Sequence, residues 1–121
     1  MAENFLLIVD DDDEIRDALE DVLGCEGYSV MGARDGQQAL EFLNAGRHPD
    51  AILLDLWMPV MDGWQLRKEL LSDSRFAKIP VIVLTAAHDQ RVPLLQVNDI
   101  LTKPVDLRKL LDALGEAGVP H

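Results

Sequence analysis

The sequence predicts an α/β protein built on a five-stranded parallel sheet with helices on both faces. Short apolar runs, typical of strands buried on both faces, alternate five times with stretches of helical periodicity. Such alternation is typical of strand–helix–strand units with right-handed crossovers. Charged and hydroxyl residues directly follow several of the apolar runs, and in a parallel sheet these positions meet at one edge. We therefore expect a doubly wound fold with a site at that edge.

Length and composition favour a single domain over residues 1–121. Cys25 is the only cysteine, which excludes an internal disulfide and a cysteine-based zinc site and favours a reducing cytoplasm. We expect neither a signal peptide nor membrane insertion, because the apolar stretches are short. The net charge of −11 argues against direct binding to nucleic acid and favours cationic partners, metal ions among them.

The first half of the chain predicts two strands and two helices. The strand Phe5–Val9 precedes a helix whose apolar residues recur at i, i+3, i+4 and i+7 and which ends around residues 24–27. A second strand is expected over Tyr28–Met31, and Asp35 is expected to cap a helix that ends near Gly46. Three acidic residues suit the start of the first helix, because they complement its dipole: Asp12, Asp13 and Glu14.

The middle of the chain contains the third strand, Ala51–Leu54, which carries Asp55 at its carboxyl end. Pro59 ends the regular structure soon afterwards. A third helix is then expected to run to about Asp73. It has one apolar face, formed by Trp64, Leu66, Leu70 and Leu71.

The last third of the chain predicts two more strands. They are Val81–Leu84, which ends at Thr85, and Asp99–Leu101, which ends shortly before Lys103. Pro93 splits the segment between these strands, so we expect a short or irregular fourth helix there. The last helix is expected to stop around residues 115–118 and has one apolar face, formed by Leu107, Leu110, Leu111 and Leu114.

Five residues at the strand ends form the candidate site: Asp10, Asp11, Asp55, Thr85 and Lys103. Its carboxylates repel each other, by about 4 kcal/mol for two charges at ~4 Å and an effective dielectric constant of about 20. A hard cation that prefers oxygen ligands, such as Mg²⁺, relieves this repulsion. The set fits a site in which Asp55 accepts a phosphoryl group, Lys103 neutralises it and Thr85 donates a hydrogen bond to it. A glycine-rich phosphate loop and a nucleophile elbow are both lacking, which argues against other hydrolytic chemistry.

Four motifs, in order along the chain, resemble those of response-regulator receiver domains, the phospho-accepting modules of two-component signalling. They are Ile8–Asp11, Leu53–Gly63, Leu84–Ala86 and Lys103–Pro104. The resemblance extends from Phe5 to about Leu114. It implies a flavodoxin-like fold with strand order 2-1-3-4-5, and a cis peptide bond before Pro104.

The resemblance also implies a role for each residue of the candidate site. Asp55 becomes the phosphorylation site and takes its phosphoryl group from a histidine kinase or a histidine phosphotransfer protein. Thr85 moves toward the phosphoryl group, Lys103 pairs with it, and the conformational change reaches a downstream protein partner. Such a switch phosphorylates and dephosphorylates itself and turns over no separate substrate. The Mg²⁺ ligands implied are Asp10, Asp11, Asp55 and the backbone carbonyl of Trp57.

Two departures from the family's pattern leave an alternative open. Ile100 stands where the family usually has Tyr or Phe, so the aromatic movement that accompanies activation has no residue to perform it. The segment between Thr85 and Lys103 is also several residues shorter than usual. The alternative is a pseudo-receiver, which binds partner proteins without being phosphorylated. A magnesium phosphatase with an aspartyl nucleophile is disfavoured, because Trp57 stands where that class has a second acid. We expect the bulk of Trp57 to slow hydrolysis of the acylphosphate.

Overall fold

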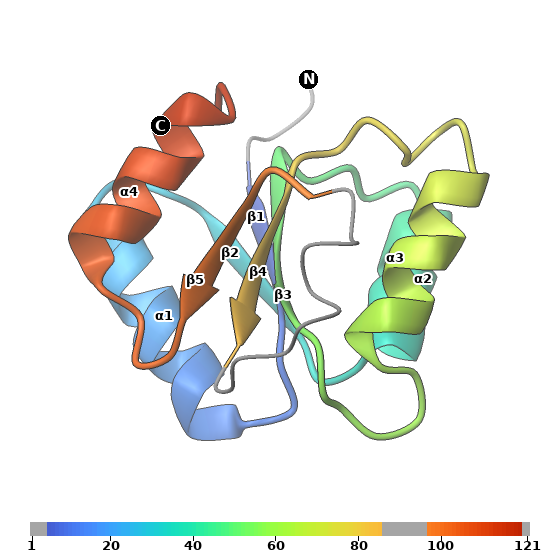
Figure 1. The fold of residues 1–121 in the computed structure, drawn as a ribbon, viewed down its shortest axis with the longest axis horizontal. Coiled ribbons are helices and arrows are strands. Elements are labelled where there is room, and N and C mark those ends of the chain that lie inside the picture. The colour runs from blue at the N-terminus through green and yellow to red at the C-terminus, as the bar shows by residue number, and fades with distance from the viewer. Residues whose placement is uncertain (1–4, 86–96, 120–121) are drawn as a thin grey trace.

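The fold is a five-stranded parallel sheet in the order β2-β1-β3-β4-β5, covered by four helices (Figure 1). The computed structural model describes residues 5–85 and 97–119, and these counts refer to that part of the chain. The strands are β1 (Leu6–Val9), β2 (Val30–Ala33), β3 (Ala51–Asp55), β4 (Val81–Thr85) and β5 (Asp99–Thr102). The helices are α1 (Asp13–Cys25), α2 (Gly36–Asn44), α3 (Gly63–Ser72) and α4 (Leu107–Glu116).

The predicted fold class and strand order are therefore confirmed. The helix expected between the fourth and fifth strands falls outside the described residues. None of the described helices is both long and apolar enough to cross a membrane.

The core has two layers, because successive residues of each strand point to opposite faces of the sheet. Helices α2 and α3 cover one face, while α1 and α4 cover the other (Figure 1). On the first face the strands contribute Leu7, Val9, Ile52, Leu54, Val81 and Val83. On the second face they contribute Leu6, Ile8, Ala51, Leu53, Ile82 and Leu84.

The five strands differ in how far they are buried. Every residue of β1, β3 and β4 is buried, as expected for parallel strands with helices on both sides. β5 forms one edge of the sheet, and only its Leu101 is buried. Ile100, on the same strand, is 36% exposed.

Every described helix begins at an aspartate whose carboxylate accepts hydrogen bonds from backbone N–H groups of the first turn. In this way the side chain satisfies donors that have no partner inside the helix. The four caps are Asp12, Asp35, Asp62 and Asp106. The capping role expected for Asp35 is thus confirmed, and the three acids expected at the start of the first helix lie there, with Asp12 as the cap and Asp13 and Glu14 in the first turn of α1.

The second strand lies two residues later than predicted. It covers Val30–Ala33 rather than Tyr28–Met31, with Leu6 paired to Val30 and Val9 to Ala33. The turn after α1 is longer than expected, because Gly27 adopts a positive φ of 95° and β2 begins only after Ser29. Glycine is also disfavoured in strands, so Gly32 concealed the second half of β2 in the sequence.

Helix α3 buries a different set of side chains from the one predicted. Leu66 and Leu70 are fully buried, as expected, but Leu71 is 38% exposed and Arg67 is only 6% exposed. Gly63 and Arg67 are four residues apart and therefore share the buried face of the helix. Burial lowers the pKa of Arg67, whose Nε and Nη1 atoms have no hydrogen-bond partner among residues 5–85 and 97–119.

Candidate functional site

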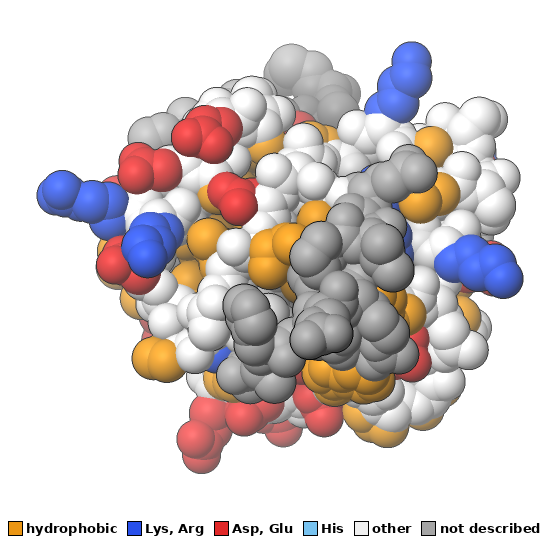
Figure 2. Space-filling model, in the orientation of Figure 1, with side chains coloured by type: hydrophobic (Ala, Val, Ile, Leu, Met, Phe, Trp, Pro, Cys, Tyr) orange, Lys and Arg blue, Asp and Glu red, His pale blue; other side chains and the backbone are white. Residues whose placement is uncertain are grey.

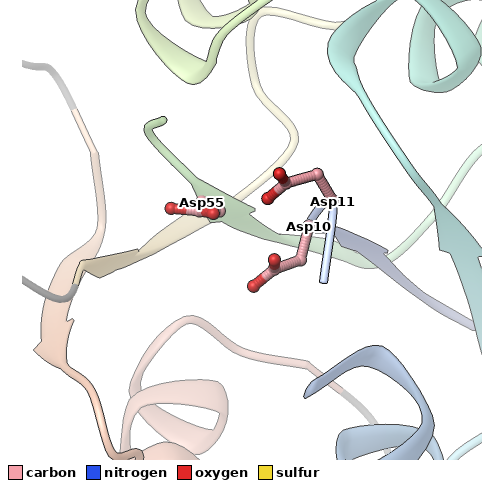
Figure 3. A group of neighbouring side chains, drawn as sticks. All are labelled: Asp10, Asp11 and Asp55. Atoms are coloured by element: carbon pink, nitrogen blue, oxygen red, sulfur yellow. The ribbon is translucent and has the colours of Figure 1, made fainter. Parts of the chain in front are cut away.

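Three aspartates meet where β1 and β3 end. Each of Asp10, Asp11 and Asp55 offers one carboxylate oxygen, and these oxygens all lie within 4.8 Å of one another. Figure 3 shows the three side chains around a common space at the ends of the two strands. Asp10 and Asp55 are buried, at 1% and 6% exposure, whereas Asp11 is exposed. The acidic cluster expected from the sequence is therefore formed.

Asp10 is fixed through its backbone and its side chain. Its N–H donates to the carbonyl of Ala33 at 3.0 Å, which continues the β1–β2 ladder by one residue. Its Oδ1 accepts from the N–H of Asp12 at 2.9 Å. Asp12 then caps α1, so the chain turns from strand to helix immediately after the cluster. Figure 2 shows acidic side chains gathered at the lower edge of the view, where α1 begins in Figure 1.

Asp55 is the last residue of β3 and is held by the connection that follows. Gly63, at the start of α3, donates its N–H to the carbonyl of Leu56 at 2.9 Å. A Cβ atom at Gly63 would lie 2.5 Å from the backbone oxygen of Asp55 and 2.7 Å from Cα of Leu56. Only glycine lets α3 come this close to β3. Gly63 therefore packs directly against the backbone of Asp55 and holds the end of β3 in place.

Lys103 crosses from the end of β5 to the acids. Its Nζ donates to Oδ2 of Asp10 at 2.8 Å and lies 3.5 Å from Oδ2 of Asp55. The backbone N–H of Lys103 donates to the carbonyl of Thr85 at 2.8 Å, and the peptide bond to Pro104 is cis, as expected. The ammonium group of Lys103 therefore contacts two of the three carboxylates, those of Asp10 and Asp55. The Lys103 side chain also lines an apolar groove of about 610 Å³ between α1 and α4.

The charges of the site perturb each other. Burial raises the pKa of Asp55 and the neighbouring Asp10 raises it further, while Lys103 and the N–H of Trp57 act in the opposite direction without cancelling the rise. Burial alone would lower the pKa of Lys103. The hydrogen bond to Asp10 and the charges of Asp55 and Asp10 outweigh that effect, so the pKa of Lys103 is raised. Lys103 therefore stays charged. Burial and the neighbouring Asp10 still disfavour ionisation of Asp55.

Thr85 and Trp57 are the two remaining residues implied for the site. Thr85 ends β4, is 4% exposed and pairs in register with Thr102 of β5. The N–H of Trp57 donates to Oδ1 of Asp55 at 3.3 Å, while the Trp57 side chain is 47% exposed. Its ring centroid lies 6.1 Å from that of Trp64 on α3, with 59° between the ring planes. An exposed indole therefore flanks the acid, and its ring is packed against a second one.

The connection from β3 to α3 contains an unusual backbone conformation. Val60 has a positive φ of 69° and is 79% exposed. The N–H of Met61 donates to the carbonyl of Pro59 at 2.8 Å, which closes a tight turn around Val60. A β-branched residue rarely adopts this φ, so the loop that follows Asp55 is strained at one residue.

The carboxylates suit a hard cation. Mg²⁺ prefers oxygen ligands and usually keeps several waters beside one or two carboxylates. Here the three carboxylate oxygens are close together, and exposed Asp11 leaves one side of the cluster open to water. The chemistry of the donor set therefore fits Mg²⁺.

The sequence did not point to Arg16 as a neighbour of the site. Its Nη1 donates to the backbone carbonyl of Asp10 at 2.7 Å, and its other nitrogen pairs with Asp13. Helical spacing reveals apolar faces, but it does not reveal how far a long polar side chain reaches back toward a strand. The only available signal was that Arg16 lies in the first turns of the helix directly after the acids.

Comparison with known proteins gives a consistent result. A family model described as response regulator receiver domain matches residues 6–115. The response regulator MprA of Mycolicibacterium vanbaalenii is 40% identical over 110 residues, which cover 88% of this chain and 46% of that protein. This chain thus spans about half the length of that curated relative.

Solved structures agree with the sequence comparison. A response regulator receiver protein from Pseudomonas putida superposes with a TM-score of 0.87 at 31% identity, covering 96% of this chain and 98% of the other. The signal receiver domain of a signal transduction histidine kinase from Syntrophus aciditrophicus gives a TM-score of 0.86 at 32% identity, covering 96% and 89% of the two chains.

Proposed function

Because the chain belongs to the response-regulator receiver family, we propose that Asp55 accepts a phosphoryl group in a Mg²⁺-dependent reaction. The donor is a histidine kinase or a histidine phosphotransfer protein, and the phosphorylated form signals to a downstream protein. The whole of residues 1–121 acts as one receiver unit in the cytoplasm. Neither direct binding to nucleic acid nor membrane insertion is part of this function.

One observation carries the proposal. The ammonium of Lys103 reaches from β5 to Asp10 and lies 3.5 Å from Asp55, at the edge where β1 and β3 also end. A half-buried lysine on an acidic cluster provides a positive charge where anionic oxygens would arrive. This arrangement supports phosphoryl transfer better than a purely structural ion pair, because Asp11 leaves the cluster open to solvent on one side.

The proposed reaction is a phosphoryl transfer between two side chains. A carboxylate oxygen of Asp55 attacks phosphorus, and the O–P bond forms as the N–P bond of the donor phosphohistidine breaks. The freed ring nitrogen keeps the electron pair and takes a proton from water, so that neutral imidazole leaves. Ionised Asp55 is the reactive form. Its raised pKa therefore favours transfer near neutral pH over transfer in acid. Water later attacks the same phosphorus, which releases inorganic phosphate and restores the carboxylate.

Lys103 and Thr85 would contact the transferred group. Lys103 exchanges its contact with Asp55 for one with a phosphoryl oxygen, since its Nζ is already 3.5 Å from that carboxylate. Thr85 ends the neighbouring strand β4, and its hydroxyl would donate a hydrogen bond to another phosphoryl oxygen. Both changes occur on β4 and β5, so the signal would leave the site on that side of the sheet.

The proposed cation site consists of Asp10, Asp11, Asp55 and the backbone carbonyl of Trp57. Mg²⁺ bound there supplies positive charge for the phosphoryl oxygens. Asp11 and Asp55 would bind it through carboxylate oxygens. Asp10, whose carboxylate also contacts Lys103, would bind it in the same way, and the backbone carbonyl of Trp57 would complete the protein ligands.

Phosphorylation by a small-molecule donor tests the proposal directly. The protein is incubated with Mg²⁺ and acetyl phosphate, and its intact mass is measured beside that of Asp55→Asn. We expect the mass of one added phosphoryl group in the wild type, and none in the variant or without Mg²⁺. Beryllofluoride, which mimics the phosphoryl group, should change the tryptophan fluorescence of the wild type. A wild type that gains no mass and does not respond to beryllofluoride contradicts the proposal and favours the pseudo-receiver.

A further inference from the structure

We propose that Arg16 is a positioning residue for the divalent cation and acts through the Asp10–Asp11 peptide. Its Nη1 donates to the backbone carbonyl of Asp10 at 2.7 Å, and its side chain is only 17% exposed. That carbonyl belongs to the peptide unit that joins the two acids of β1's end. A hydrogen bond to this carbonyl fixes the orientation of the peptide plane between Asp10 and Asp11, and so the directions of both side chains. The inference rests on the proposed Mg²⁺ site.

The bond to Arg16 completes the restraints on Asp10. Its N–H is held by Ala33 at 3.0 Å, and its carboxylate is held by Lys103 at 2.8 Å and by the N–H of Asp12 at 2.9 Å. Without Arg16, the peptide between Asp10 and Asp11 would lose its restraint on the carbonyl side. Asp11 is the exposed member of the cluster, so the direction of its side chain depends most on that peptide (Figure 3).

Arg16 is itself held in place from two directions. Its second nitrogen pairs with Asp13 in the first turn of α1. Its aliphatic part passes over Gly32 of β2, where an added Cβ would lie 3.3 Å from Cδ of Arg16 and 2.7 Å from Oε1 of Glu20. The absence of a side chain at position 32 therefore leaves room for the arginine. Because Arg16 is already fixed in this way, its side chain loses little conformational entropy when the cation binds.

Positioning and simple electrostatics predict opposite effects on Mg²⁺ binding. Arg16 is a positive charge beside an acidic cluster, so electrostatics alone predicts that its removal tightens binding of a cation. If Arg16 instead positions the peptide, its removal weakens binding. Loss of a group that orients metal ligands typically costs about tenfold or more in metal affinity. The sign of the change separates the two explanations.

The test is a Mg²⁺ titration followed by tryptophan fluorescence, with calorimetry as a second readout. Arg16→Met keeps most of the aliphatic chain and removes the guanidinium. Arg34→Met is the matched control, because Arg34 follows β2 at the same edge of the sheet and is 72% exposed. Arg16→Lys retains a donor, and Gly32→Val displaces the arginine without changing the charge of the protein. Thermal unfolding without metal is measured for every variant.

We expect Arg16→Met to bind Mg²⁺ about tenfold more weakly than the wild type. Gly32→Val should also weaken binding, Arg16→Lys should recover part of the affinity, and Arg34→Met should bind equally well or slightly better. Equal or tighter binding by Arg16→Met, with the wild type binding normally, overturns the inference and leaves the proposed function intact. A wild type that does not bind Mg²⁺ overturns both. Weaker binding that follows the loss of thermal stability across all variants also overturns it, because the role of Arg16 is then only structural.

Discussion

The two sides of the candidate site are built on very different strands. The acids Asp10 and Asp55 directly follow or end strands that are buried along their whole length in the middle of the sheet. Lys103 follows β5, an edge strand with a single buried residue. The acid side is therefore held within the buried core, whereas the lysine follows an edge strand that pairs with β4 on one side only among the described residues.

This difference suits a switch. A phosphoryl acceptor and its metal ligands need a fixed geometry, because misplacement of reacting groups is costly. The groups that respond to the new charge need freedom to move, and the least buried parts of a protein provide it. The site thus combines a fixed half with a movable half across one ammonium–carboxylate contact of 2.8 Å.

The largest expected effect comes from comparing the strands themselves. Leu53 on β3 is fully buried and Ile100 on β5 is 36% exposed. We expect Leu53→Ala to lower the free energy of unfolding by roughly 3 kcal/mol, because it leaves a cavity in the core. Ile100→Ala should cost roughly 1 kcal/mol or less, since much less apolar surface is lost. Urea unfolding of both variants measures the two values, and equal losses would remove the contrast between the central and edge strands.

Lys103→Met should break the contact between the two halves. Asp10, at 1% exposure, then loses its charged partner, and we expect a loss of about 2 kcal/mol in the absence of metal. Mg²⁺ should restore most of that stability, because it replaces the missing positive charge. Thermal unfolding of the variant with and without Mg²⁺ provides the measurement. Stability that does not respond to Mg²⁺ would show that the lysine does more than balance the acids.

Ionisation of Asp55 should make the free energy of unfolding depend on pH. The pKa of Asp55 is raised in the folded protein, so the folded state binds more protons than the unfolded state at pH values between the normal and the raised pKa. Stability contributed by protonated Asp55 is therefore lost as the pH rises from about 4 through the folded-state pKa. Asp55→Asn removes this loss. We expect the metal-free variant to be more stable than the wild type at pH 7 in urea unfolding, and the difference to disappear near pH 3.

A Val60 substitution should give the smallest effect. Relieving its positive φ of 69° with Val60→Asn should stabilise the protein by about 0.5–1 kcal/mol, since asparagine tolerates this conformation. At 79% exposure the valine side chain contributes little packing that could be lost. Val60→Ala, which keeps the steric penalty of a Cβ, serves as the control and should gain less. An unchanged melting temperature in Val60→Asn would argue against strain in this loop.

Sequence reasoning identified the parts of the molecule that depend on local pattern. Buried parallel strands leave continuous apolar runs, and strand ends meet at one edge, so Asp10, Asp55 and Lys103 could be brought together without coordinates. The cap at Asp35 followed in the same way from its position before helical periodicity. The strands and this cap are determined by residues that are close in the chain, and the meeting of Asp10, Asp55 and Lys103 follows from the parallel order of those strands.

The features that were missed depend on contacts between elements. The start of β2 was misplaced because its pairing with β1 overrides the poor strand preference of Gly32. The burial of Arg67 follows from the close approach of α3 to β3, which spacing along one helix does not reveal. The bond from Arg16 to Asp10 joins a helix to a strand end through a flexible side chain.

The contact at Gly63 limits how this sequence can diverge. The residue contributes no atom that would bind the cation or the phosphoryl group, yet any side chain there would collide with the backbone of Asp55 and Leu56. In a saturation library selected for phosphorylation, we expect position 63 to tolerate nothing but glycine, while its exposed neighbours in α3 accept many residues. We therefore expect position 63 to change more slowly during evolution than much of the surface around the site, because the path of the main chain excludes every side chain there.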